Sequence, residues 1–248
     1  MKRKLALLAM LLLCGGAAFA QKDTAFVMPD HFLELEQLPD EGYYLPAPPK
    51  EDQLGFANDI LRYQWGKTVR ATDRGKQAAD DAQYTLDYLF GYYAEAFGTL
   101  VSEEATPETW KLLVGGIVDG GLAVKRGKRK YKRLRPYVYF GDSTPVPADE
   151  EVLRNSGSYP SGHTARGWMC ALIMVQLNPD RQNAILKAGY EYGESRVIVG
   201  YHYQSDVDAA RIASSAAFAR LQSSEKYQKQ LKKALKELKK LSTLNVKL

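Results

Sequence analysis

Apolar side chains recur at intervals of three and four residues along most of the chain. This spacing predicts amphipathic helices that each bury one face. No run of alternating apolar and polar residues predicts a strand, and the chain has no internal repeat. We therefore expect an all-α fold, a single-domain helical bundle. Helical patterns begin at or near Asp52, Ala79, Thr106, His163, Pro179 and Ser205.

Breaks in the pattern indicate where helices start and stop. The apolar stripe that begins at Ala79 continues to Phe97 and predicts one long helix. Thr106 is expected to cap the next helix, with Pro107 in the first turn. Residues 136–158 contain several prolines and glycines, so they predict a loop.

The sequence from residue 21 onward has two ends whose composition differs from that of its middle. Residues 21–50 are rich in Pro, Asp and Tyr and predict an extended arm over the body. Residues 51–224 form the helical domain, and no linker divides it. Residues 225–248 predict a basic amphipathic helix that packs its apolar stripe on the body and turns its lysines to solvent. Binding of this helix to a membrane surface or a partner is the alternative.

The first twenty residues have the features of a secretory signal peptide. Residues 2–4 are basic, residues 5–13 are apolar, and Ala18-Phe19-Ala20 is a small-x-small cleavage site. This apolar run is too short for a permanent transmembrane helix, and no later run is long enough. We expect export to the periplasm, or secretion if the host lacks an outer membrane. A lipoprotein signal at Cys14 is less favoured because the bulky Leu13 precedes it.

The net charge of +5 is unevenly distributed. The leader contributes three cations and residues 225–248 a net +6, which leaves −4 for residues 21–224. A mildly acidic body does not predict nucleic-acid binding. Once Cys14 is removed with the leader, Cys170 stands alone and cannot form an internal disulfide. Its apolar neighbours predict a buried side chain.

Candidate chemistry begins in the basic run at residues 125–135, which Pro136 follows. Arg135 offers a planar fork of donors and Lys128 a point charge, and both suit a phosphate. A run of this kind is more often a solvated surface. Only Lys128 and Arg135 are expected to point inward.

A second segment, Tyr159-Pro160-Ser161-Gly162-His163, precedes a predicted helix. Backbone N–H groups at a helix N-terminus suit an anion, and Gly162 permits close approach of the backbone. Ser161 can add a hydroxyl donor, and His163 would stand at the mouth of the site. The alternative is a capped helix with an ordinary histidine near its start.

The third segment, residues 195–206, contains Arg196, His202 and Asp206. Arg196 supplies another fork of donors. His202 and Asp206 are four residues apart and share a face if the segment is helical. Asp206 could accept from one ring nitrogen and leave the other as a nucleophile, although it could also cap a helix.

Together, the three segments provide cations, a Ser-Gly turn, two of the three histidines and a carboxylate. A metal-free enzyme needs these groups to bind a phosphate and transfer it through histidine. No cluster of His, Cys and carboxylates has the spacing of metal ligands.

The pattern Lys-x6-Arg-Pro, Pro-Ser-Gly-His and Ser-Arg-x5-His-x3-Asp resembles the type 2 phosphatidic acid phosphatase (PAP2) superfamily. The chain looks most like the bacterial class A nonspecific acid phosphatases over residues 40–220. Segments outside the motifs share the likeness, among them Leu45-Pro-Ala-Pro-Pro49 and Thr72-Asp-Arg-Gly75. The resemblance implies a helical bundle of the PAP2/haloperoxidase type. It also implies a metal-independent phosphatase of broad specificity for small phosphate monoesters, without a cofactor. A homodimer or larger homo-oligomer is possible in this family.

The resemblance also implies a role for each residue of the motifs. His202 would attack phosphorus and form a phosphohistidine, with Asp206 orienting its ring. His163 would act as general acid and then as general base. The remaining motif residues would hold the phosphate oxygens: Lys128, Arg135, Ser161, Gly162 and Arg196.

Three other functions are alternatives for a chain with these phosphate-binding motifs. A vanadium haloperoxidase binds vanadate where the phosphatase binds phosphate, although such chains are generally much larger. A phosphatase for lipid A or phospholipid headgroups could work from the aqueous side of a membrane. An exported phosphate-binding module would have no need for an oriented nucleophile opposite a second histidine.

Overall fold

The computed structural model describes residues 29–245, and this part of the chain contains helices but no β-strand. The prediction of an all-α fold is confirmed. The predicted leader, the start of the arm and residues 246–248 lie outside the described residues. The α-helices are α1 Leu54–Val69, α2 Asp73–Asp80, α3 Leu86–Phe97, α4 Pro107–Leu122, α5 Lys125–Tyr131, α6 Pro136–Phe140, α7 Glu150–Arg154, α8 Gly162–Leu177, α9 Gln182–Ile198, α10 Gln204–Leu221 and α11 Glu225–Asn245. The 3-10 helices are η1 Leu35–Gln37, η2 Pro147–Asp149 and η3 Pro179–Arg181.

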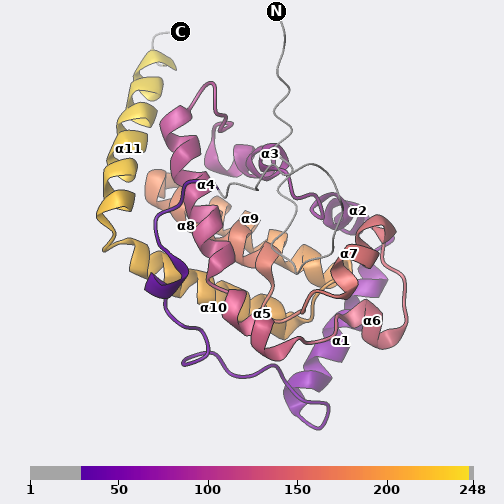
Figure 1. The fold of residues 1–248 in the computed structure, drawn as a ribbon. Helices are drawn as coiled ribbons and strands as arrows, with labels where there is room; N and C mark the ends of the chain where they lie inside the picture. Colours follow the sequence, from indigo (N-terminus) through magenta and orange to yellow (C-terminus); the bar gives the residue numbers. More distant parts are fainter. Residues whose placement is uncertain (1–28, 246–248) are drawn as a thin grey trace, which may run out of the picture.

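Helix α8 lies at the centre of the fold, where it packs against α4, α9 and α10 (Figure 1). Helices α1 and α2 contact α9, and α11 runs along α4. A backbone hydrogen bond of 3.0 Å from the Ser161 N–H to the Asp206 carbonyl joins the first turns of α8 and α10. This packing brings two of the three candidate segments together.

Helices α4 and α8 approach closely because α4 carries glycines on the facing side. A Cβ atom on Gly116 would lie 2.1 Å from Cδ1 of Ile173. A Cβ atom on Gly120 would lie 2.9 Å from the carbonyl oxygen of Ala165. Dense packing of this kind transmits any added volume as strain. The contact therefore fixes the position of α8, whose first turn carries part of the candidate site.

Two sequence-based boundaries are wrong. The single helix expected from Ala79 to Phe97 is divided into α2 and α3. The Thr85 side chain accepts a hydrogen bond from the Tyr88 N–H and caps α3, so the chain turns between the two helices. The expected loop at residues 136–158 contains the short helices α6 and α7, and Pro136 is the first residue of α6.

The C-terminal helix α11, yellow in Figure 1, runs along the edge of the fold and packs one face against its core. Tyr227, Leu231 and Ala234 are buried in the main hydrophobic cluster. Glu237 accepts hydrogen bonds from the N–H groups of Glu108 and Thr109 at 3.0 and 2.9 Å. Thr106 is the N-cap residue of α4 and Pro107 is its first residue, as predicted, but the Thr106 side chain makes no capping hydrogen bond, and a carboxylate from α11 accepts from these donors instead.

The described part of the arm is tied to α4 by a buried carboxylate. Asp119 accepts from the backbone N–H groups of Phe32 and Leu33, each at 3.2 Å. Cys170 is fully buried in the main core, as its neighbours predict. Among residues 29–245, no helix has both the length and the apolar character needed to cross a membrane.

Candidate active site

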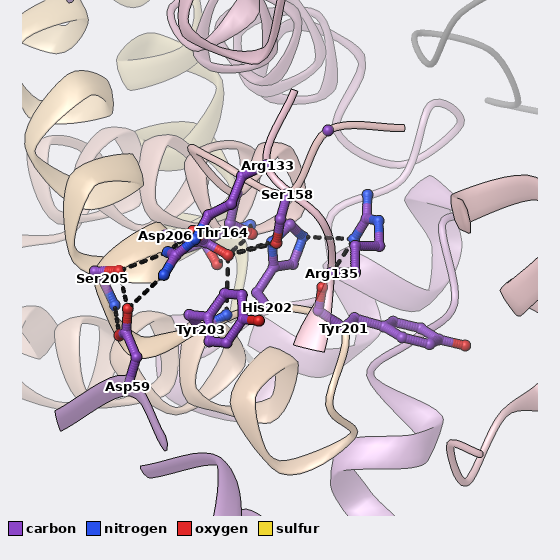
Figure 2. Close-up of polar contacts among 12 residues, drawn as sticks. Asp59, Arg133, Arg135, Ser158, Thr164, Tyr201, His202, Tyr203, Ser205 and Asp206 are labelled. Atoms are coloured by element: carbon purple, nitrogen blue, oxygen red, sulfur yellow. Dashed lines mark hydrogen bonds and ion pairs between the residues drawn. The ribbon is translucent and has the colours of Figure 1, made fainter. Parts of the chain in front are cut away.

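Among the predicted site residues, Arg135, His202 and Asp206 lie together around the start of α10 in Figure 2. The predicted site residues come from five places in the fold: Lys128 in α5, Arg135 just before α6, Ser161 to His163 at the start of α8, Arg196 near the end of α9, and His202 and Asp206 at the start of α10. The structure brings all of them into one cluster. Their roles stay predictions.

The hydrogen bonds around His202 define which ring nitrogen carries the lone pair. Arg135 Nη1 lies 3.1 Å from Nε2 of His202. Because arginine has no acceptor, Nε2 must accept this bond. Nδ1 then carries the hydrogen, and it lies 3.2 Å from Ser158 Oγ and 3.4 Å from Asp206 Oδ2. The arrangement places a lone pair on Nε2, as a nucleophile requires.

Asp206 has two functions at the start of α10. Its Oδ2 atom accepts from the Tyr203 N–H at 2.9 Å and so completes a capping box. The same oxygen accepts from Ser158 Oγ at 2.5 Å and faces His202. Asp206 therefore caps the helix and lies against the histidine ring, two uses that the sequence left open.

A network that the sequence analysis missed holds the other oxygen of Asp206. Arg133 Nη1 lies 2.7 Å from Asp206 Oδ1, and Arg133 Nη2 lies 2.8 Å from Asp59 Oδ2 (Figure 2). Asp59 also accepts from the backbone N–H and the hydroxyl of Ser205. Both carboxylates are 0% exposed and the Arg133 side chain is 9% exposed. We call Arg133, Asp59 and Ser205 the positioning network.

The start of α8 forms a cradle with unpaired donors near it. Ser161 Oγ accepts from Thr164 N–H and thereby caps α8. A Cβ atom on Gly162 would lie 3.3 Å from Cε of Lys128, so the lysine reaches this turn. Arg196 is fully buried, and its Nε and Nη2 atoms have no partner among the described residues. Buried donors without acceptors are costly, so they suit an anionic ligand.

His163 is held between aromatic rings near the same cluster. Its ring stacks on Tyr192 at 4.4 Å and meets the Tyr84 edge at 4.9 Å. The backbone carbonyl of Asp81 accepts a hydrogen bond from the imidazole. Nε2 is buried without a partner. The ring is therefore oriented from one nitrogen while the other is left for a ligand.

Burial and neighbouring cations set the charge of the site. Burial, followed by the charge of Arg196, lowers the pKa of His163 well below its usual value. Burial and then Arg135 lower the pKa of His202 in the same way. Burial alone would raise the pKa of Asp206, but its bond with His202 and the charge of Arg133 outweigh it and lower that pKa. The site thus pairs neutral histidines with an ionised aspartate and several cations.

Other residues outside the predicted set support the site. The Ser195 hydroxyl donates to Asp81 Oδ2 at 2.5 Å, and Arg196 Nη1 lies 3.3 Å from the Asp81 carbonyl. The serine of the Ser-Arg pair therefore anchors the segment that orients His163. Ser158 could have been noticed because it lies three residues before Ser161, whereas no sequence signal marks Asp81. Within residues 29–245, no group of three His, Cys, Asp or Glu side chains is arranged to hold a metal ion.

Comparison with known proteins gives one family. The model of the PAP2 superfamily matches residues 108–227, which include every predicted site residue. The chain is 45% identical to a non-specific acid phosphatase of Providencia stuartii over 91% of this chain and 92% of that protein. It is 40% identical to a non-specific acid phosphatase of Salmonella typhimurium, with 84% and 83% covered. An acid phosphatase of Zymomonas mobilis is 32% identical, with 81% and 76% covered.

Proposed function

The chain belongs to the PAP2 superfamily, and from this membership we propose that it is an acid phosphatase that hydrolyses phosphate monoesters through a phosphohistidine on His202. One observation carries the mechanistic part. Arg135 donates to Nε2 of His202, while Ser158 and Asp206 lie at Nδ1. A nucleophilic histidine needs this tautomer, since the lone pair must face the phosphate.

The first step transfers the phosphoryl group to the enzyme. The lone pair on Nε2 of His202 forms a bond to phosphorus, and the bond between phosphorus and the ester oxygen breaks. The leaving oxygen takes a proton from His163, which must be protonated at the start. Because burial and Arg196 lower the pKa of His163, the free enzyme holds this proton at acid pH. A bound phosphate dianion favours the protonated ring and offsets part of this effect.

The second step returns the enzyme to its starting state. The neutral His163 takes a proton from water, and the water oxygen attacks phosphorus. The bond between phosphorus and Nε2 of His202 breaks, so inorganic phosphate leaves and the lone pair returns to the ring. Asp206 stabilises the positive charge that His202 gains while it carries the phosphoryl group.

Cations and neutral hydrogen-bond donors stabilise the charge on the transferred phosphoryl group in both steps. We assign this role to Lys128, Arg135, Arg196, Ser161 and the Gly162 N–H. Phosphoryl transfer depends mainly on positioning and charge stabilisation, so such a cradle is the larger part of catalysis. The unpaired Nε and Nη2 atoms of Arg196 support this assignment.

We also propose that the protein is exported. The leader at residues 1–20 supports export, to the periplasm in a host with an outer membrane. Broad specificity is consistent with a cradle that contacts the phosphoryl group more than the alcohol.

Hydrolysis of p-nitrophenyl phosphate by residues 21–248 tests the proposal. We expect turnover that survives EDTA, is highest below neutral pH and disappears in His202→Ala. His31→Ala removes a histidine outside the site and should keep full turnover. Loss of activity in EDTA, or full activity in His202→Ala, would refute the mechanism.

A further inference from the structure

Arg166 lies on α8, three residues after His163, and no hydrogen bond or ion pair engages it within residues 29–245. Its Nε atom is buried, yet no acceptor lies near it. Arg133 and Arg135 differ, because they bind carboxylates or carbonyls, whereas the buried Arg196 also has nitrogen atoms without a hydrogen-bond partner. A guanidinium that is partly buried without an acceptor loses hydration and gains no protein partner in return. Such a group suits an anionic ligand.

Two glycines show where the guanidinium lies. A Cβ atom on Gly121 of α4 would lie 2.8 Å from Nε and 2.9 Å from Nη2 of Arg166. A Cβ atom on Gly162 would lie 3.4 Å from its Nη1. Arg166 therefore rests on the bare backbone of α4 and reaches the turn that also meets Lys128. It borders the phosphate cradle at Gly162.

A small cavity extends from His163 toward Arg166. Its lining includes Tyr84, Leu89, Ile117, His163, Arg166 and Tyr192. Arg166 is the only arginine or lysine in this lining. Its other walls are mainly apolar or aromatic, and Tyr84 lies partly exposed at its edge. The cavity is thus on the side of the general acid, where the leaving alcohol must be protonated.

We propose that Arg166 and this cavity form a leaving-group subsite that selects phosphate monoesters whose alcohol carries a second anionic group, a carboxylate or a phosphate, close to the ester oxygen. The inference rests on the proposed function, since it takes His163 as the group that protonates the leaving oxygen. An arginine binds either anion through two parallel hydrogen bonds. The small volume of the cavity restricts the second anion to within a few bonds of the ester oxygen.

The subsite predicts a preference that two matched substrates can measure. Glycerol 3-phosphate and 3-phosphoglycerate have the same ester group and differ by a hydroxymethyl against a carboxylate. We expect Arg166→Gln to lower kcat/KM for 3-phosphoglycerate by about tenfold through KM, the effect of one charge-assisted contact. The kcat/KM for glycerol 3-phosphate should change less, because it loses only the effect of the Arg166 charge on the pKa of His163, which both substrates share. Release of inorganic phosphate measures both.

Two further variants separate position from charge. Gly121→Ala keeps the charge of Arg166 but displaces the guanidinium, and it should lose the same preference. Arg220→Gln removes an equal charge from the surface of α10 and should leave the preference unchanged.

An equal loss on both substrates in Arg166→Gln would overturn the proposal and place Arg166 in the phosphate cradle. An unchanged ratio in Arg166→Gln or Gly121→Ala would also overturn it. Wild-type turnover of glycerol 3-phosphate tests the proposed function separately. If that activity is present, failure concerns the subsite alone.

Discussion

Arg133 offers a sharp test of how the fold holds the proposed nucleophile in place. The substitution Arg133→Met keeps much of the side-chain volume and removes the charge. It leaves Asp59 and Asp206 as buried carboxylates without their shared cation. The same change at Arg129, an exposed residue of α5, removes an equal charge from the surface and is the matched control.

The magnitude follows from burial. Because both carboxylates are 0% exposed, solvent does not screen either ion pair. Removing one partner of a buried ion pair costs about 3–5 kcal/mol in the free energy of unfolding. For a protein of this size the melting temperature should fall by roughly 6–20 °C. Arg129→Met should change the free energy of unfolding by less than about 0.5 kcal/mol.

Urea denaturation of the single and double variants provides the assay. In Asp59→Asn, one of the two carboxylates is already neutral, so Arg133→Met should cost less there. We expect a coupling free energy of about 0.5–3 kcal/mol between the two positions. The kcat of Arg133→Met should also fall, because Asp206 loses the bond that fixes one of its oxygens.

Two results would refute this reasoning. One is a loss of stability in Arg133→Met no greater than in Arg129→Met. The other is strict additivity of Arg133→Met and Asp59→Asn, which would mean that the positioning network does not act as a unit.

Two further predictions concern stability. The pKa values of His163 and His202 are lowered in the folded state, so the unfolded chain binds protons first as pH falls below about 6.5. Below that pH, each histidine should lower the free energy of unfolding by up to about 1.4 kcal/mol per pH unit. Asp119 also titrates in this range, because burial raises its pKa to about 7 and the stability that its protonated form contributes is lost as pH rises through that value. The contribution of the histidines is therefore measured as the difference in free energy of unfolding between the wild type and the double variant His163→Asn/His202→Asn. An equal dependence on pH in the two proteins would contradict the prediction. The substitution Glu237→Ala in α11 leaves two N–H groups of α4 without acceptors. The free energy of unfolding, measured in urea, should fall by about 1–2 kcal/mol. An unchanged value would show that water replaces the carboxylate.

Local patterns were enough to predict the all-α fold and the segments that carry the site, but they missed the break between α2 and α3 and the short helices α6 and α7. The spacing of His202 and Asp206, and the Pro-Ser-Gly-His turn, depend on residues close in sequence. Their approach in space was predicted because the chemistry needs all of them at once. Homo-oligomer formation stays a prediction, as does the leader, which lies outside the described residues.

Contacts between distant segments could not be predicted in this way. Asp59 and Arg133 are 74 residues apart, and no periodicity links them. Arg133 was not singled out because it lies in a run of basic residues. The sequence of that run does not show which of its cations are buried by the packing of α1 and α10. The cap of α4 was missed for the same reason, since Glu237 lies 128 residues after Thr109. Tertiary packing supplied a stronger acceptor than the local threonine.

The most direct test of the account is to trap the covalent intermediate. In His163→Ala, p-nitrophenyl phosphate still has a good leaving group for the first step, but no base activates water for the second. We predict a burst of one equivalent of p-nitrophenolate per site. Mass spectrometry after a quench at alkaline pH should find an acid-labile phosphoryl group on His202. Steady turnover without a burst, or a phosphoryl group on another residue, would contradict the proposed mechanism.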